Sequence, residues 1–97
     1  MKATFLIKLL AETSKPEIMN LLLKALFTNK EIKELENRIK IFQLLLKGKK
    51  QREISEILNV GVATVTRGAS ALENEDIFKV NSEVIQMLKT NKFDLND

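Results

Sequence analysis

The stretch from Gln51 to Leu72, QREISEILNVGVATVTRGASAL, carries the side chains of this chain best suited to molecular recognition. On a helix that begins near Val62, the apolar residues Val65, Ala69 and Leu72 recur at helical spacing and are expected to point into a core together with Val62. The outer face then carries Ala63, Thr64, Thr66, Arg67 and Ser70. Small, polar and positively charged side chains suit a helix that lies in the major groove of DNA.

A shorter helix is expected just before this one. Ile54, Ile57 and Leu58 supply its apolar side, and Asn59 falls in the turn, where a residue that tolerates left-handed backbone angles is needed. Two short helices joined by a tight turn predict a helix-turn-helix over residues 51–72.

Positive charge is densest at the entry to this motif. Residues 47–72 hold five Lys or Arg against two Asp or Glu, whereas residues 73–97 hold three against six. Charge runs on small proteins are usually solvated faces. Beside a helix-turn-helix, however, cations can meet phosphates, and those at the entry are Lys47, Lys49, Lys50 and Arg52.

Composition excludes most enzyme classes. The 97 residues contain no Cys and no His, so thiol nucleophiles, imidazole bases, disulfides and structural zinc are not expected. We therefore predict no catalytic residues, no metal and no enzymatic activity. The chain has no apolar run near 18 residues and no cleavable signal pattern, so we expect a cytoplasmic protein without a membrane partner.

The remaining pattern is helical. Helices are expected at about 3–11 and 16–26, with Pro16 in a first turn, and a long helix should start at the capping-box sequence Thr28 to Glu31. Gly48 is a plausible stop for that helix. After the motif, residues 73–76 form a connector, and a last helix is expected at about 78–88. The predicted fold class is all-α with six helices. The inward positions expected outside the motif are Phe5, Leu6, Leu9, Leu10, Ile32, Leu35, Ile39, Phe42, Leu46, Val80, Val84, Ile85 and Leu88.

Three segments together resemble the tryptophan repressor family: Ala63 to Gly68, Gln51 to Glu53, and Asn37 to Ile41. The likeness extends from about Ala25 to Leu72. It implies one domain, residues 1–97, that forms an intertwined homodimer. Residues 1–46 and 77–90 would build the dimer core, 51–72 the DNA-reading head and 91–97 a tail. Apolar positions in excess of what a small monomer can cover agree with this, and a monomer that buries them internally is the alternative.

The resemblance also implies L-tryptophan, or an indole analogue, as corepressor. By position, Arg38 and Arg67 would hold the indole ring between them, Thr28 and Arg67 would receive the ligand carboxylate, and carbonyls near Ala25 and Phe27 would accept from its ammonium group. Gly68 would let the ring lie close to the helix; a glycine inside a helix costs about 1 kcal/mol relative to Ala, so something must require it. Taken singly, these arginines would be surface residues and Thr28 a helix cap.

One position departs from the family pattern. Ala71 stands where the family has a serine near the ligand ammonium, and Ser70 lies one residue earlier, rotated by about 100°. A neutral hydrogen bond contributes about 0.5 to 1.5 kcal/mol, so tryptophan should bind several-fold more weakly unless the ligand is an indole acid without an amine.

The predicted function is a sequence-specific, tryptophan-dependent transcriptional repressor of tryptophan biosynthesis or transport genes, with operator DNA as partner. Arg52 is the expected reader of guanine. The other expected DNA contacts are Val62, Ala63 and Thr66 near base edges, and Lys50, Gln51 and Thr64 at phosphates. Two alternatives remain: an effector-independent helix-turn-helix regulator, and a helical dimerising adaptor that binds an acidic protein.

Overall fold

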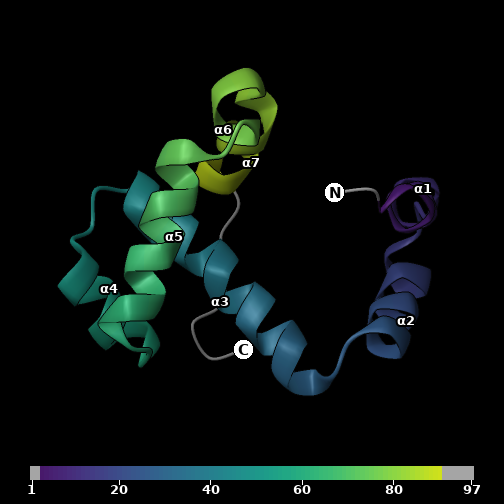
Figure 1. Ribbon diagram of the computed structural model, residues 1–97, viewed down its shortest axis with the longest axis horizontal. Coiled ribbons are helices and arrows are strands. Elements are labelled where there is room, and N and C mark those ends of the chain that lie inside the picture. Colours follow the sequence, from purple (N-terminus) through teal and green to yellow (C-terminus); the bar gives the residue numbers. More distant parts are fainter. Residues whose placement is uncertain (1–2, 91–97) are drawn as a thin grey trace. The chain divides into compact units, whose positions relative to one another are not determined.

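The computed structural model describes residues 3–90, and these form helices without any strand. The all-α fold class is confirmed (Figure 1). The chain divides into two compact units, residues 1–34 and 35–97, which are described separately below. Within the described part, no helix is both long and apolar enough to cross a membrane. The predicted tail at 91–97 lies outside the described residues.

The first unit contains two helices, α1 (Thr4–Glu12) and α2 (Pro16–Leu26). The hydroxyl of Thr13 donates to the carbonyl of Leu9 at 2.7 Å, which ends α1, and Pro16 occupies the first turn of α2 as expected. Neither helix holds a buried residue. The predicted inward residue Phe5 is 79% exposed, and Leu21 of α2 is 63% exposed. These apolar side chains have no cover within the first unit.

Helix α3 (Asn29–Leu46) is the longest helix in the described part and begins as predicted. The Thr28 N–H donates to Glu31 Oε1 at 2.9 Å, and the Glu31 N–H donates to Thr28 Oγ1 at 3.1 Å, which completes a capping box. The hydrogen bond from the backbone of Thr28, and to a smaller degree that from its side chain, lowers the pKa of Glu31. At the other end, Gly48 has φ +86°, and the Lys49 N–H donates to Leu44 O at 3.1 Å. Gly48 is therefore the helix stop that the sequence predicted.

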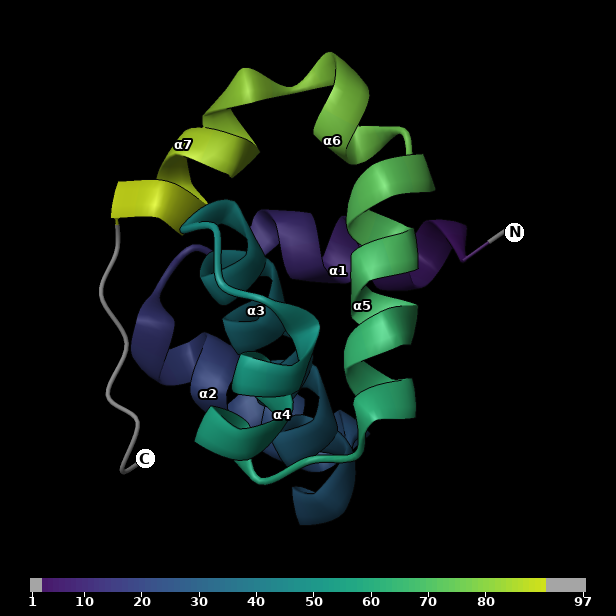
Figure 2. The same cartoon turned by 90° about the vertical axis from the view of Figure 1, so that its left-hand side faces the viewer.

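The core of the second unit joins three helices: the C-terminal half of α3, α4 (Gln51–Leu58) and α5 (Val62–Asn74). Ile41, Ile54 and Val65 are fully buried, one from each helix, and Leu44 is buried beside them. Leu45, Leu58 and Val60 pack around this cluster. The ribbon accordingly places α4 and α5 side by side against α3 (Figures 1 and 2).

The predicted helix-turn-helix is present in α4 and α5. Asn59 ends α4 with φ 54° and ψ 50°, which confirms the predicted left-handed turn residue. The Val60 N–H donates to Ser55 O at 3.1 Å, and the Ser55 hydroxyl donates to Val60 O at 2.6 Å. These bonds satisfy carbonyls at both sides of the turn and hold the angle between the helices.

The single last helix predicted at 78–88 is wrong. The structure has two helices there, α6 (Ile77–Val80) and α7 (Ser82–Thr90), so the described residues form seven helices instead of six. Asn81 breaks the run because its Oδ1 accepts from the N–H groups of Glu83 and Val84 at 2.9 and 3.2 Å. This is the hydrogen bonding of an N-cap, so a new helix starts after Asn81.

Two contacts attach this C-terminal pair to α3. The rings of Phe42 and Phe78 meet edge to face, with centroids 5.0 Å apart. Near the end of α7, Gln43 Nε2 donates to the carbonyl of Leu88 at 3.1 Å. Both anchors lie in the C-terminal half of α3, the same half that supports the helix-turn-helix.

Several predicted core positions are wrong for the single chain. Val62 is 52% exposed because it lies at the first position of α5, one turn before the buried Val65. Val80 is 79% exposed, because α6 ends directly after it. Ile57, Leu6, Leu35 and Ile39 are also exposed. The apolar residues of α3 that are buried, Ile41 and Leu44, belong to a second face of that helix, on which Lys40 and Gln43 are buried as well.

Candidate nucleic-acid interface

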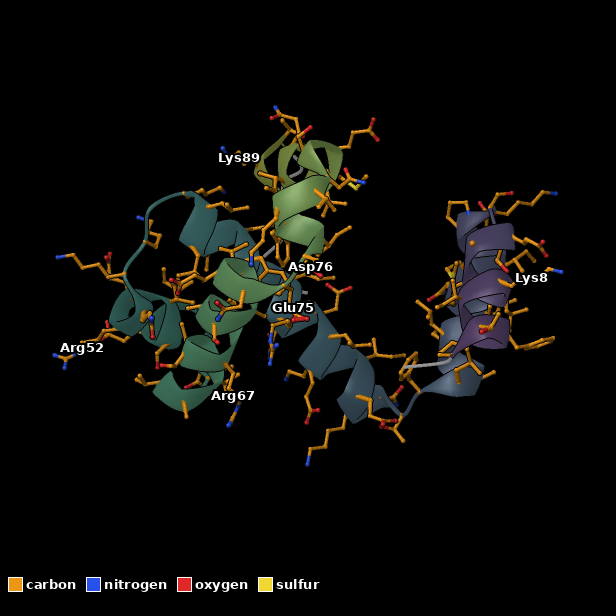
Figure 3. All side chains as sticks on the ribbon, turned by 45° about the horizontal axis from the view of Figure 1, so that its top comes forward. Lys8, Arg52, Arg67, Glu75, Asp76 and Lys89 are labelled. Atoms are coloured by element: carbon orange, nitrogen blue, oxygen red, sulfur yellow. The ribbon has the colours of Figure 1, made fainter. Side chains whose placement is uncertain are left out.

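The predicted DNA contacts gather on one accessible part of the second unit. Lys50 and Arg52 are exposed at the start of α4, and Val62, Ala63 and Thr66 are exposed on α5. Gln51 and Thr64 are half-buried. Figure 3 shows the Arg52 and Arg67 side chains extending away from the ribbon, while Glu75 and Asp76 lie beyond the C-terminal end of α5. The positive and small side chains of α4 and α5 thus come before the acidic residues Glu75 and Asp76 in the chain.

The first turn of α4 is held by its own residues. Lys50 is the N-cap residue, with ψ 151°, and its backbone N–H donates to Glu53 Oε1 at 3.2 Å. The acidic Glu53 therefore satisfies a backbone donor of the first turn. Arg52 lies between these two residues in the sequence and its side chain remains exposed.

Gln51 and Thr66 connect the two helices of the motif. The Thr66 hydroxyl donates to Gln51 Oε1 at 2.8 Å. Both residues are predicted DNA contacts, one at a phosphate and one near base edges. The structure brings them into direct contact with each other, which their separation of 15 residues in the sequence did not reveal.

Gly61 is a candidate interface residue that the sequence interpretation missed. It is the N-cap of α5, with φ −67° and ψ 149°, angles that any residue can adopt, and a Cβ built on it would meet nothing within 4 Å. Neither backbone strain nor packing in the chain therefore requires glycine there. A side-chain-free N-cap allows a phosphate group to approach the first backbone N–H groups of the helix. The detectable signal was a glycine where Ser, Thr, Asp or Asn is favoured.

Gly68, in contrast, is explained by packing between helices. It is buried, and a Cβ built on it would lie 2.6 Å from Cγ2 of Ile41 and 3.5 Å from Cδ of Arg38. The missing side chain therefore lets α5 lie close against α3. Arg38 is half-buried beside this contact, whereas Arg67 is exposed. The structure thus brings Arg38 and Gly68 together, and the ligand roles of Arg38, Arg67 and Gly68 stay predictions.

The other predicted ligand contacts lie in the first unit. Ala25 lies in the last turn of α2 and Phe27 is the C-cap residue of that helix, and the role of their carbonyls as acceptors for a ligand stays a prediction. Thr28 Oγ1 accepts from the Glu31 N–H, and the Glu31 carboxylate lies beside it. A ligand carboxylate at Thr28 would therefore have to share this hydroxyl with Glu31. Thr28 is also the predicted helix cap.

Comparisons with known proteins agree on one family. The family model described as Trp repressor protein matches residues 2–80. A Trp operon repressor homolog of Xylella fastidiosa is 37% identical over 73 residues, covering 74% of this chain and 79% of the relative. Homologs with the same name from Photobacterium profundum and Vibrio campbellii are 39% and 45% identical. They cover 71% and 57% of this chain, and 68% and 56% of the relatives. No solved structure matches the chain significantly.

Proposed function

Since the chain belongs to the Trp repressor protein family, we propose that it acts as a homodimeric, sequence-specific DNA-binding repressor. L-tryptophan, or a related indole acid, is the proposed corepressor, and tryptophan biosynthesis or transport genes are the proposed targets. The family consists of transcription regulators and not of enzymes, and the proposal needs no catalytic group.

The observation that carries the proposal is the construction of the head. Ile41, Ile54 and Val65 fix α3, α4 and α5 to one another through a fully buried core. The opposite side of α5 presents Ala63 and Thr66, small enough for the backbone to approach base edges. Arg52 extends from the neighbouring helix with five fixed donors, which suits the paired acceptors of guanine.

Homodimer formation is supported by the apolar residues that the single chain leaves uncovered. Phe5 and Leu21 are exposed in the first unit, as are Leu35 and Ile39 on α3. Large apolar side chains in such number are typical of surfaces that another chain covers. The assignment of 1–46 and 77–90 to a dimer core remains part of this proposal.

The effector site is supported by arginine chemistry. Arg38 is held beside α5 by the close approach at Gly68, and a guanidinium plane can stack on an indole ring. The carbonyls of Ala25 and Phe27 are the proposed acceptors for the ligand ammonium group. Ala71, half-buried on α5, offers no hydroxyl, which weakens this ammonium contact.

Calorimetric titration with L-tryptophan and indole-3-propionate tests the effector part of the proposal. The wild-type chain should bind both ligands. Ala71→Ser should tighten tryptophan binding by about 0.5 to 1.5 kcal/mol and should leave indole-3-propionate nearly unchanged, because that ligand has no amine. Equal gains for both ligands would show that residue 71 does not face the amine.

A second candidate function is an effector-independent repressor. It is favoured by the contact between Gly68 and Ile41, which accounts for the helical glycine without any ligand. The same calorimetry separates the two candidates: if wild type binds neither indole compound but retains sequence-specific DNA binding, the effector-independent regulator is the correct function.

A further inference from the structure

The hydrogen bond between Thr66 and Gln51 restricts what these two side chains can offer to a partner. A glutamine amide has one acceptor oxygen and an NH2 group with two donor hydrogens, and a threonine hydroxyl has a single hydrogen. In the structure that hydrogen is donated to Gln51 Oε1 at 2.8 Å. The amide oxygen therefore faces Thr66, and the Nε2 group on the opposite branch of the amide is directed elsewhere.

The surroundings of Gln51 place this donor group at the proposed interface. Gln51 is the first residue of α4 and follows the exposed Lys50, while Thr66 is on the outer face of α5, one turn after Ala63. Gln51 is half-buried, so its body is held between the helices. A long side chain that is already held loses less conformational entropy when a partner binds.

Resting on the proposed DNA-binding function, we propose that Thr66 is a positioning residue that fixes the Gln51 amide with its NH2 group toward DNA, where Gln51 donates a hydrogen bond to an acceptor atom. DNA offers such acceptors as phosphate oxygens and as base-edge atoms of the major groove. Lys50, adjacent to Gln51, is itself a proposed phosphate contact. Thr66 thus acts on DNA recognition through Gln51, in addition to its own place near the bases.

A double-mutant cycle on the full-length chain tests the coupling. The probes are a fluorescent duplex selected by the wild-type protein from a random pool and a random duplex of equal length. Thr66→Val keeps the branched shape and removes the hydroxyl hydrogen, and should weaken binding roughly three- to tenfold. In a chain that carries Gln51→Ala, the same Thr66→Val change should cost clearly less, because only the contact of Thr66 itself near the bases is then lost. Thr66→Ser, which keeps the hydroxyl, should restore the coupling to Gln51.

The two kinds of DNA assign the acceptor. If Thr66→Val weakens binding to both duplexes, the acceptor is a phosphate oxygen. If it weakens binding to the selected duplex alone, the acceptor is a base-edge atom; either result supports the proposal. Gln51→Glu keeps an acceptor for Thr66 but replaces the NH2 donor by a negative charge, so it should weaken binding more than Gln51→Ala does.

Asn74→Ala is the matched control. It removes another exposed hydrogen bond between side chains of α5, from Asn74 Nδ2 to Ser70 Oγ at 3.2 Å, and should leave binding to both duplexes unchanged. If Thr66→Val weakens binding equally with Gln or Ala at position 51, alongside a lower thermal midpoint, Thr66 has a structural role and the proposal is overturned. A wild-type chain that selects no duplex from the pool and does not bind the random duplex would overturn the proposed function as well, which distinguishes the two failures.

Discussion

At the scale of single residues, the contact between Gly68 and Ile41 controls how closely α5 approaches α3. A Cβ at position 68 would lie 2.6 Å from Ile41 Cγ2, closer than two carbon atoms can stay. Ala is favoured over Gly in a helix by about 1 kcal/mol, whereas overpacking a core costs about 1–3 kcal/mol. The packing effect should therefore outweigh the gain in helix propensity.

We accordingly expect Gly68→Ala to lower the free energy of unfolding, and Gly68→Val to lower it further. Ile41→Leu moves the branch from Cβ to Cγ and removes the atom nearest to position 68. In urea unfolding, the double variant Gly68→Ala with Ile41→Leu should be more stable than the sum of the two single effects predicts. Strict additivity would contradict this account of Gly68. Because of this contact, Gly68→Val is a poor probe of ligand binding by itself.

Arg52 and Lys50 should differ in how they serve DNA binding, although both are exposed at the start of α4. Arg52→Ala should abolish the preference for the selected duplex over a random duplex, because a bidentate contact to guanine is worth about 1–3 kcal/mol. Lys50→Ala should weaken binding to both duplexes alike and reduce the salt slope by about 1. Anisotropy titrations at several salt concentrations measure both effects. Unchanged discrimination in Arg52→Ala would rule out its role as base reader.

At the scale of elements, the start of α3 should make folding sensitive to acid. The pKa of Glu31 is lowered in the folded state by the hydrogen bonds from Thr28. A group with a lowered folded pKa stabilises the fold above its unfolded pKa, ordinarily 4.5, and this contribution is lost as the pH falls through the folded pKa. Glu31→Gln should therefore flatten the decline of the urea midpoint below about pH 4.5. An identical decline in wild type and variant would show that this cap contributes nothing.

The helix boundaries and caps were predictable from sequence because their signals are local. Pro16, the Thr28 to Glu31 box, Gly48 and Asn59 all act within a few residues of themselves. The break at Asn81 was missed, since one asparagine within an apolar helical pattern is a weak signal until its side chain is seen to cap the next turn.

Contacts between helices were harder to predict from the sequence than helix boundaries. The segment IKIFQLLL of α3 has apolar residues on two faces, and the sequence alone does not show which face packs against α4 and α5. Helical spacing predicts that the apolar residues in line with Ile39 form the core. In the structure, Ile41 is the residue buried against Gly68. The bond between Gln51 and Thr66 depends on the crossing of α4 and α5, which no local pattern encodes.

At the scale of the whole molecule, stability should depend on association. We expect a second chain to cover the apolar residues that α1 and α2 expose. Sedimentation should therefore give a dimer, and the urea midpoint should rise with protein concentration over a hundred-fold range. A folded monomer at micromolar concentration with a constant midpoint would exclude the dimer.

Selection of binding sites from a random duplex pool, with and without L-tryptophan, tests most directly whether two such heads read DNA together as we propose. A homodimer with one reading helix per chain should enrich an inverted repeat, with half-site centres about one helical turn, or roughly 10 base pairs, apart. Enrichment should be stronger when L-tryptophan is present. An enriched site without two-fold symmetry, or no enrichment under either condition, would contradict DNA reading by a homodimer.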